Sequence, residues 1–156
     1  MKILSVVMVC ALLMSFKPRT QDWLLVIHAD GAKLTASTLE LVNVGPFGVG
    51  FTAEGSGHRE AVSLITKDFL THWNDIFATR PPNAALSFMG KGGNLQEQVL
   101  LLESATLVGN NVRFKIQQMG EEQSGGEFGV VNLFIDGSKY VCGGTNRFLP
   151  VCGGPG

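Results

Sequence analysis

The sequence has little charge and no excess of basic residues. Charged residues make up 16% of the 156 residues, and the formal net charge at pH 7 is -1. A protein that binds nucleic acid through the phosphates needs a basic face that displaces counterions. The 12 lysines and arginines are scattered along this chain, so we expect no nucleic-acid partner.

The sequence also lacks a complete catalytic or nucleotide-binding motif. It contains no G-x-S-x-G nucleophile elbow and no G-x-G-x-x-G between a strand and a helix. The glycine-rich turn at 90–94 does not have the spacing of a P-loop. We therefore name no catalytic residue, expect no cofactor, and favour a non-enzymatic function.

Only one long apolar run is present, and it lies at the N-terminus. Lys2 precedes an apolar core from Ile3 to Met14, which is typical of a secretory signal peptide. The run is shorter than the about 20 residues that a membrane-spanning helix needs. We predict a signal peptide over 1–16 and one domain over 17–156, in a secreted or periplasmic location without a membrane span after cleavage. A retained anchor or a buried strand is the alternative.

Cysteine is scarce, with three residues in the chain. Removal of the signal peptide would leave Cys142 and Cys152, an even count in an exported protein. We predict a disulfide between them that closes the C-terminal loop and stabilises the fold by roughly 2–3 kcal/mol. A two-cysteine metal site is the alternative, and it lacks two further ligands nearby.

The residues that are abundant favour a β-rich fold. Hydrophobic residues make up 45% of the chain, and its 20 glycines and 10 phenylalanines fit a turn-rich β protein. Asp30–Gly31 is typical of a hairpin turn, as is Gly109–Asn110. The fold class we predict is mainly β (α+β): an antiparallel β-sandwich or partly open barrel with one amphipathic helix packed on it. The predicted strands are 23–29, 33–37, 39–44, 49–53, 84–89, 97–107, 112–118 and 128–136.

One stretch, 63–77, has the spacing of an amphipathic helix. Its apolar residues recur at intervals of three and four, with Ser63 or Thr66 as the N-cap and Pro81 beyond the end. We expect this helix to pack on the sheet. The predicted apolar side consists of Ile65, Phe69, Leu70, Trp73, Ile76 and Phe77.

Several short motifs occur together in the order seen in one group of proteins. They are Trp23, Phe51–Thr52, Phe69–Leu70, Trp73, Phe77, Pro81–Leu86 and Leu133–Asp136. In this pattern the chain resembles an uncharacterised family of small secreted or exported proteins. The resemblance implies a common fold and no particular activity. The chain departs from the family at 53–60, where AEGSGHRE replaces a DRP-type element and Arg59 corresponds to its arginine.

The candidate binding residues are few. His58, Arg59 and Glu60 form the most polar cluster, in a glycine-bearing loop, and Asn83 lies in the PPNA segment. A second pair, Asp68 and His72, is separated by one helical turn and has the spacing of a metal-binding pair. For this pair we favour a solvated helix face over a metal site.

These observations leave three functional hypotheses. The first is an exported non-catalytic β-rich module for partner binding or assembly, with an unknown protein, a cell-surface partner or another copy as its partner. The second is a small hydrolase that uses His58, Glu60 or the His72–Asp68 pair. The third is a carrier with an apolar cavity inside the barrel, unless Phe51, Trp73 and Phe114 fill it.

Overall fold

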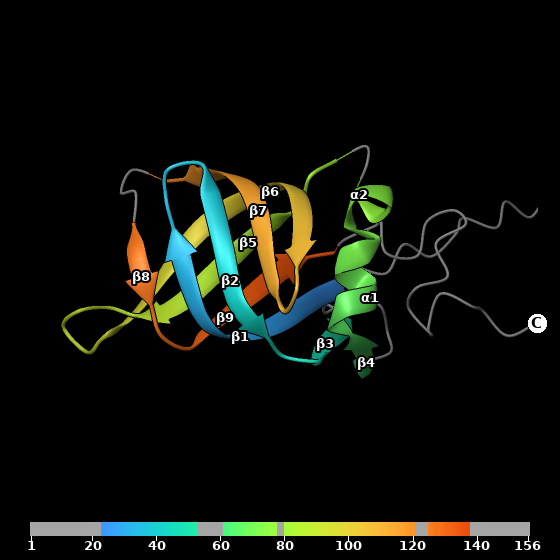
Figure 1. Ribbon diagram of the computed structural model, residues 1–156, viewed down its shortest axis with the longest axis horizontal. Helices are drawn as coiled ribbons and strands as arrows, with labels where there is room; N and C mark the ends of the chain where they lie inside the picture. The colour runs from blue at the N-terminus through green and yellow to red at the C-terminus, as the bar shows by residue number, and fades with distance from the viewer. Residues whose placement is uncertain (1–22, 53–60, 78–79, 121–124, 138–156) are drawn as a thin grey trace, which may run out of the picture.

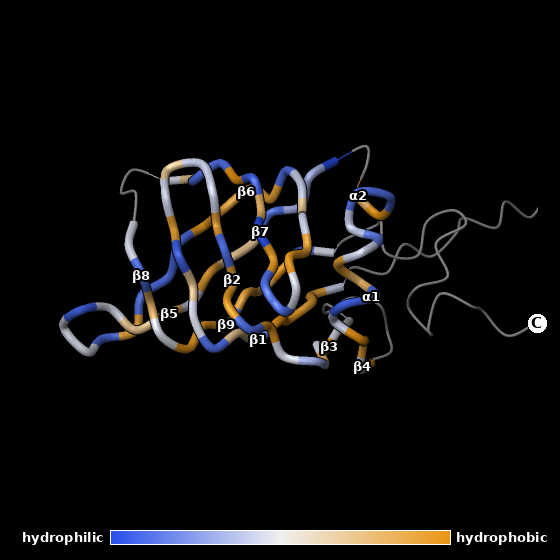
Figure 2. Tube along the Cα trace, in the orientation of Figure 1, coloured by the Kyte–Doolittle hydropathy of each residue, from blue (hydrophilic) through white to orange (hydrophobic). Residues whose placement is uncertain are grey.

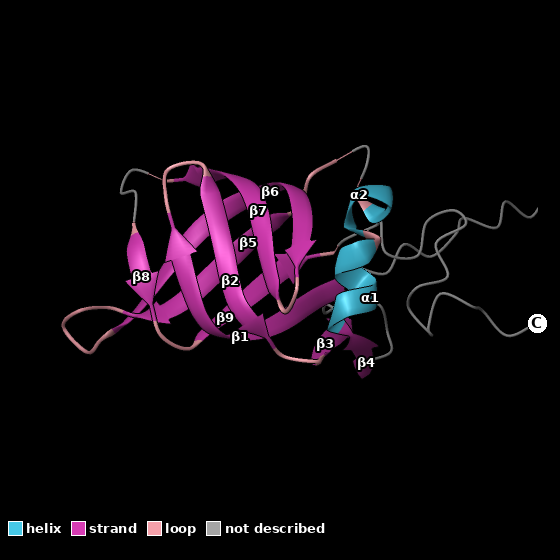
Figure 3. Ribbon diagram, in the orientation of Figure 1, coloured by secondary structure: helices cyan, strands magenta, loops and turns pink. Residues whose placement is uncertain are grey.

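The computed structural model describes residues 23–52, 61–77, 80–120 and 125–137, which form a mainly β fold with two short helices at one end (Figures 1 and 3). The predicted signal peptide, the 53–60 loop and the predicted disulfide lie outside these residues. The strands are β1 Trp23–Leu34, β2 Thr38–Val44, β3 Phe47–Thr52, β4 Ala61–Ile65, β5 Asn83–Met89, β6 Leu95–Val108, β7 Asn111–Met119, β8 Gly126–Phe128 and β9 Val131–Asp136. The helices are α1 Thr66–Thr71 and α2 Trp73–Ile76.

The strand pairing closes into a ring. β1 pairs with β2, and the path continues through β7, β6, β5 and β9 back to β1, with every pairing antiparallel. The ring is a closed six-stranded antiparallel barrel. β3 and β4 lie outside this ring, and β8 pairs with the end of β1. The mainly β prediction is confirmed.

β1 belongs to both parts of the sheet because its two halves have different neighbours along one edge. Its second half pairs with β2, and its first half pairs with β3. The chain passes from β2 to β3 through a corner at Gly45–Pro46, where the Gly45 amide donates to the His28 carbonyl oxygen at 2.8 Å. Asn43, just before this corner, has a φ of 51°, a conformation that asparagine tolerates better than most residues. The β3–β4 hairpin therefore projects from the side of the barrel.

The turn predicted at Asp30–Gly31 is wrong, because β1 continues through it to Leu34. The reversal lies a few residues later, where the Thr35 hydroxyl oxygen accepts the Thr38 amide at 3.0 Å. Gly31 serves another purpose, since a Cβ there would lie 3.3 Å from the Phe128 carbonyl oxygen. The glycine thus allows two strands to approach closely, and the side-chain chemistry of Thr35 decides the position of the hairpin.

The predicted helix over 63–77 is also corrected. Residues 61–65 form β4, in which Ser63 pairs with Val49 of β3, and α1 begins only at Thr66. The N-cap is Ile65, with extended backbone and no side-chain cap, so the predicted caps are wrong. Ile65 is exposed and does not join the apolar side of the helix. Strand pairing with β3 overrides the helical periodicity at this end.

The remaining apolar residues of the helices pack into the core as predicted. Trp73 is fully buried, and its ring centroid lies 4.5 Å from that of Phe77 and 5.0 Å from that of Phe114 on β7. Phe69 completes the cluster in an edge-on contact with Trp73 at 5.7 Å. Phe51 is instead exposed on the outside of β3, so it does not fill the core together with Trp73 and Phe114. The helices lie at one end of the barrel, with α1 packed against β4 and β6 (Figure 1).

The predicted strands 97–107 and 112–118, with the turn between them, are confirmed as the β6–β7 hairpin. Val112, Phe114 and Ile116 are buried, the residues between them face outward, and hydropathy alternates along β7 (Figure 2). β6 contains a feature that the sequence did not reveal. A register shift between Leu102 and Ser104 leaves Glu103 as an extra residue, so the buried positions change from even to odd numbers. Because of this β-bulge, β6 directs apolar side chains into the core both before and after the bend.

Candidate interaction surface

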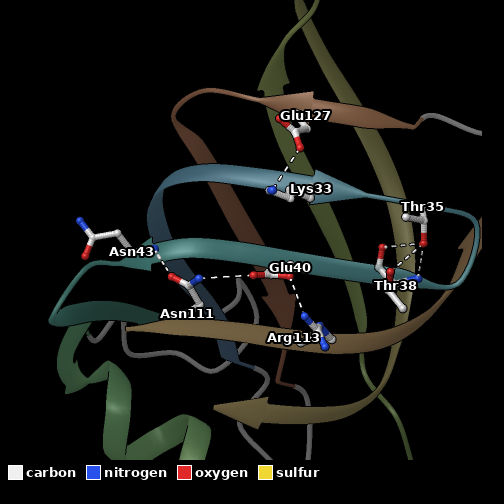
Figure 4. A network of polar contacts seen from close by, with 8 residues as sticks. All are labelled: Lys33, Thr35, Thr38, Glu40, Asn43, Asn111, Arg113 and Glu127. Atoms are coloured by element: carbon white, nitrogen blue, oxygen red, sulfur yellow. Dashed lines mark hydrogen bonds and ion pairs between the residues drawn. The ribbon is translucent and has the colours of Figure 1, made fainter. Parts of the chain in front are cut away.

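One side of the barrel, over β2 and β7, is covered by charged and polar side chains. Glu40 and Arg113 are cross-strand neighbours, and Arg113 Nη2 donates to Glu40 Oε2 at 3.0 Å (Figure 4). Asn111 Nδ2 donates to the other carboxylate oxygen at 3.3 Å. The hydrogen bond from Arg113, followed by its charge, lowers the pKa of Glu40 below its ordinary value. The carboxylate is therefore ionised at neutral pH and is part of a solvated polar network.

Two further ion pairs belong to this side. Lys115 Nζ lies 2.7 Å from Glu103 Oε2, and this hydrogen bond together with the charge of Glu103 raises the pKa of Lys115. Lys33 Nζ lies 3.1 Å from Glu127 Oε1 (Figure 4). Each of these cations has an acidic neighbour at close range. The charges of each pair therefore balance one another and do not indicate a binding site for a charged ligand.

The other side of the barrel carries an unbroken row of apolar residues. The strand registers place one apolar residue from each of six strands in a line of cross-strand neighbours on the outer face. We call these residues the apolar row: Val49, Val26, Phe134, Ala85, Val99 and Met119, from β3, β1, β9, β5, β6 and β7 in that order. Val99 is 49% exposed and Met119 is 43% exposed, so the row is open to solvent at its β6–β7 end.

A polar row borders the apolar row on one side. His28, Asn132, Ser87 and Glu97 are cross-strand neighbours two residues along the same strands. His28 Nδ1 and Asn132 Oδ1 lie 3.1 Å apart and form a hydrogen bond across this row. The outer face thus changes from apolar to polar over two residues along each of these strands. The apolar surface therefore has a defined edge, as in protein contact sites with a polar rim.

Asn83, one of the predicted binding residues, lies at the opposite border. It lines a shallow depression of about 250 Å³ together with Asp136 and four apolar neighbours, Leu24, Ala84, Val99 and Phe134, and with Ala85 of the row. Among the described residues of its lining, all but the two polar rim residues are apolar. Asn83 is therefore placed at the edge of an apolar contact surface.

The apolar row ends at the β3–β4 hairpin, which exposes several large apolar side chains to solvent. Phe47 is 67% exposed and its cross-strand neighbour Ile65 is 54% exposed. Phe51, a neighbour of Leu24 on β1, extends the same surface. The order of residues in β3 explains this arrangement: glycine alternates with large apolar residues, and the glycines face inward.

The inward glycines are required by close packing. A Cβ on Gly48 would lie 2.9 Å from the Val26 carbonyl oxygen and 3.0 Å from Leu64. A Cβ on Gly50 would lie 3.0 Å from Leu25. At these two positions β3 therefore has no room for an inward side chain, and the large residues that alternate with the glycines, Phe47, Val49 and Phe51, point outward.

A second cleft of about 380 Å³ lies where β2 leaves the barrel. It is lined by the Gly45–Pro46 corner, the Gly109–Asn110 turn and Ile65, and Lys67 is the one charged residue among the described residues of its lining. The described part of this lining contains no carboxylate, histidine or hydroxyl, so these residues offer no acid–base pair for catalysis.

The other predicted site residues are the 58–60 cluster and the Asp68–His72 pair. His58, Arg59 and Glu60 lie outside the described residues. Asp68 is exposed on α1, and His72 Nδ1 lies 2.8 Å from the Asp68 backbone oxygen. Within the part of the chain that is described, no group of three His, Cys, Asp or Glu residues could hold a metal ion.

Comparisons with known protein families, with curated proteins and with solved structures each found no match to this chain. No helix among the described residues is both long and apolar enough to cross a membrane. The class that the fold defines is a mainly β protein with a segregated surface: charged over β2 and β7, and apolar from β3 round to β6. The apolar part of this surface is the feature that most needs a functional explanation.

Proposed function

We propose that this protein is an exported, non-catalytic β-rich module that assembles with other copies of itself through the apolar surface at the β3–β4 hairpin. The observation that carries the proposal is the unbroken apolar row, which ends at a hairpin with large exposed apolar side chains. A contiguous apolar surface bordered by polar residues is typical of a protein contact site.

A second copy is the occupant we favour because the hairpin offers two complementary features side by side. β4 ends the sheet, and within the described residues β3 is its one strand partner. β4 carries no charged residue and no proline, the features by which natural proteins commonly protect an exposed sheet edge. An edge that no described strand pairs with, beside an apolar face, suits a copy of the same hairpin.

The alternative functions have less support. A small hydrolase would need a cluster of acid, base and nucleophile, and the described candidates, Asp68 and His72, form no such cluster. A carrier of apolar ligands would need space inside the barrel, and the inward side chains there, such as Leu86 and Leu133, are fully buried.

Sedimentation velocity of the mature protein over a range of concentrations tests the proposal. We expect the average mass to rise with concentration, because apolar surface is removed from water on assembly. Replacement of the paired Phe47 and Ile65 by serine should raise the dissociation constant by at least about tenfold. A strict monomer at all concentrations would overturn the proposal.

The chain offers a matched control for this variant. Met89 and Leu95 are also cross-strand neighbours, and they are 56% and 66% exposed at a different place on the barrel. Serine at both of these positions removes a similar exposed apolar pair. We expect this control to leave assembly unchanged, and equal weakening by both double variants would point to nonspecific association.

A further inference from the structure

We infer that two copies of the chain join through their β4 edges, antiparallel and two-fold symmetric, with Ser63 facing Ser63 of the second copy. The inference rests on the proposed function and specifies its contact. Three features of β4 lead to it: the direction of its backbone groups, the sizes of its side chains, and its position at the end of the apolar row.

The backbone groups of β4 alternate between the two edges. The Thr66 amide donates to the Pro46 carbonyl oxygen at 3.0 Å, which fixes the phase of the β3–β4 ladder. Antiparallel hydrogen bonds recur at every second pair, so the groups of Leu64 and Val62 face β3. The amides and carbonyls of the alternate residues, Ala61, Ser63 and Ile65, therefore face the outer edge of β4, with which no described strand pairs.

These three residues are symmetric about Ser63. If two β4 strands pair with Ser63 opposite Ser63, Ala61 of each copy lies opposite Ile65 of the other. All outward amides and carbonyls then meet in hydrogen-bonded pairs. A shift by one residue would place inward-facing groups of one strand against outward-facing groups of the other, so the phase of the ladder excludes it. A shift by two residues keeps the phase but leaves one of the three outward residues of β4 without a partner in the other β4, so the Ser63-centred register pairs the most groups.

The side chains fit the same register. On the outer face, small Ala61 lies beside large Ile65 of the second copy, and the two Ser63 hydroxyls meet at the axis, where they can hydrogen-bond. On the inner face, Val62 lies opposite Leu64. No pair within β4 brings two charges together, since the strand has none.

The position of β4 makes the contact continuous with the surface already described. Ser63 is the cross-strand neighbour of Val49, the last residue of the apolar row. Pairing through Ser63 places the two apolar rows end to end across the two-fold axis. It also brings Ile65, beside Phe47 of its own copy, into one line with Ala61 and Phe51 of the second copy. The exposed hairpin side chains thereby gain neighbours on both strands.

Ser63→Pro tests the edge pairing, with Ser63→Ala as its control. Proline removes the outward amide and leaves the β3 ladder intact, because the Ser63 amide does not face β3. We expect Ser63→Pro to raise the dissociation constant of the dimer on the order of tenfold to a hundredfold, and Ser63→Ala to raise it less than about threefold. Circular dichroism checks that the proline variant is folded.

A cysteine cross-link gives a readout that does not depend on the proline variant. Hydrogen-bonded antiparallel neighbours have Cα atoms about 5.5 Å apart, within the range of a disulfide. Ser63→Cys should form a linkage between the two introduced cysteines on mild oxidation, identified by peptide mass spectrometry. Thr106→Cys, exposed on β6, should give no such symmetric linkage.

The outcomes separate this inference from the proposed function. Suppose that the Phe47 and Ile65 changes weaken the dimer, but that it tolerates Ser63→Pro and that Ser63→Cys forms no cross-link. This result would overturn the edge pairing and leave assembly through the apolar face standing. Loss of the dimer in Ser63→Pro without a cross-link in Ser63→Cys would overturn the Ser63-centred register. A monomeric wild-type protein would overturn both.

Discussion

Removal of the Trp73 side chain should be among the most destabilising single changes in the protein. The indole is fully buried and contacts three aromatic rings, those of Phe69, Phe77 and Phe114. Truncation of a buried aromatic residue to alanine costs about 3–5 kcal/mol, because lost burial and the residual cavity add. A cavity between the helices and the barrel would also loosen the packing that closes this end.

Trp73→Phe separates the ring from its polar atom. The indole Nε1 is buried and has no hydrogen-bond partner among the described residues. An unpaired buried donor costs about 1–3 kcal/mol, so phenylalanine loses part of the packing but also removes this penalty. We expect Trp73→Phe to cost about 1–2 kcal/mol, well below the alanine variant.

Urea unfolding followed by far-ultraviolet circular dichroism measures both values. Asn74→Ala, at the exposed neighbouring position, serves as the control and should change the unfolding free energy by less than about 0.5 kcal/mol. Trp23 remains as an independent fluorescent probe in both Trp73 variants. If Trp73→Ala lowered the free energy of unfolding by less than about 1 kcal/mol, the packing of the helices on the end of the barrel would not depend on this ring and the argument would be refuted.

Three further predictions concern other parts of the chain. Gly48→Ala should lower the free energy of urea unfolding by about 1–3 kcal/mol, whereas Gly129→Ala should not lower it, because the space at its Cβ is open. Equal losses in the two variants would contradict the close-approach argument. The lowered pKa of Glu40 means that its ionised form stabilises the folded state above the unfolded pKa. The unfolding free-energy difference between wild type and Glu40→Gln should therefore shrink as the pH falls below about 4.3, and a constant difference would refute this. Intact mass of the secreted protein should show loss of 1–16 and of two hydrogens at Cys142 and Cys152; free thiols there would exclude the disulfide.

Local pattern was sufficient for the elements whose neighbours in space are also neighbours in sequence. The β6–β7 hairpin has a two-residue reversal at Gly109–Asn110 and strict alternation in β7, and both are present. The aromatic side of the helices was also predictable, because Phe69, Trp73 and Phe77 recur at helical spacing within one short stretch.

The errors arose where distant strands decide the outcome. Ser63 and Ile65 fit a helical pattern, but they are strand residues because β3 pairs with them. Asp30–Gly31 has turn chemistry, but β1 continues because β2, β8 and β9 hold it on both edges. The bulge at Glu103 is likewise set by the register with β7. None of these pairings leaves a signal in the local sequence.

The apolar row could not be predicted for the same reason. Each of its members is one apolar residue in an otherwise ordinary strand, and only the registers of five separate pairings bring them into line. The one local signal was the alternation of glycine with phenylalanine and valine in β3. It indicated a strand, but it gave no indication that the large residues face solvent.

That alternation is also the strongest reason to assign the hairpin a role beyond folding. The inward glycines satisfy the packing of β3 on Val26, Leu25 and Leu64, and the outward side chains add nothing to that packing. Polar residues at Phe47 and at its exposed neighbours would leave the same core intact and would remove an exposed apolar surface that promotes association. Folding alone therefore does not explain why the large apolar residues are there. A contact that buries them, with β4 as its hydrogen-bonding edge, does explain it, and it predicts that serine at Phe47 and Ile65 should weaken assembly while costing the monomer less than about 1 kcal/mol.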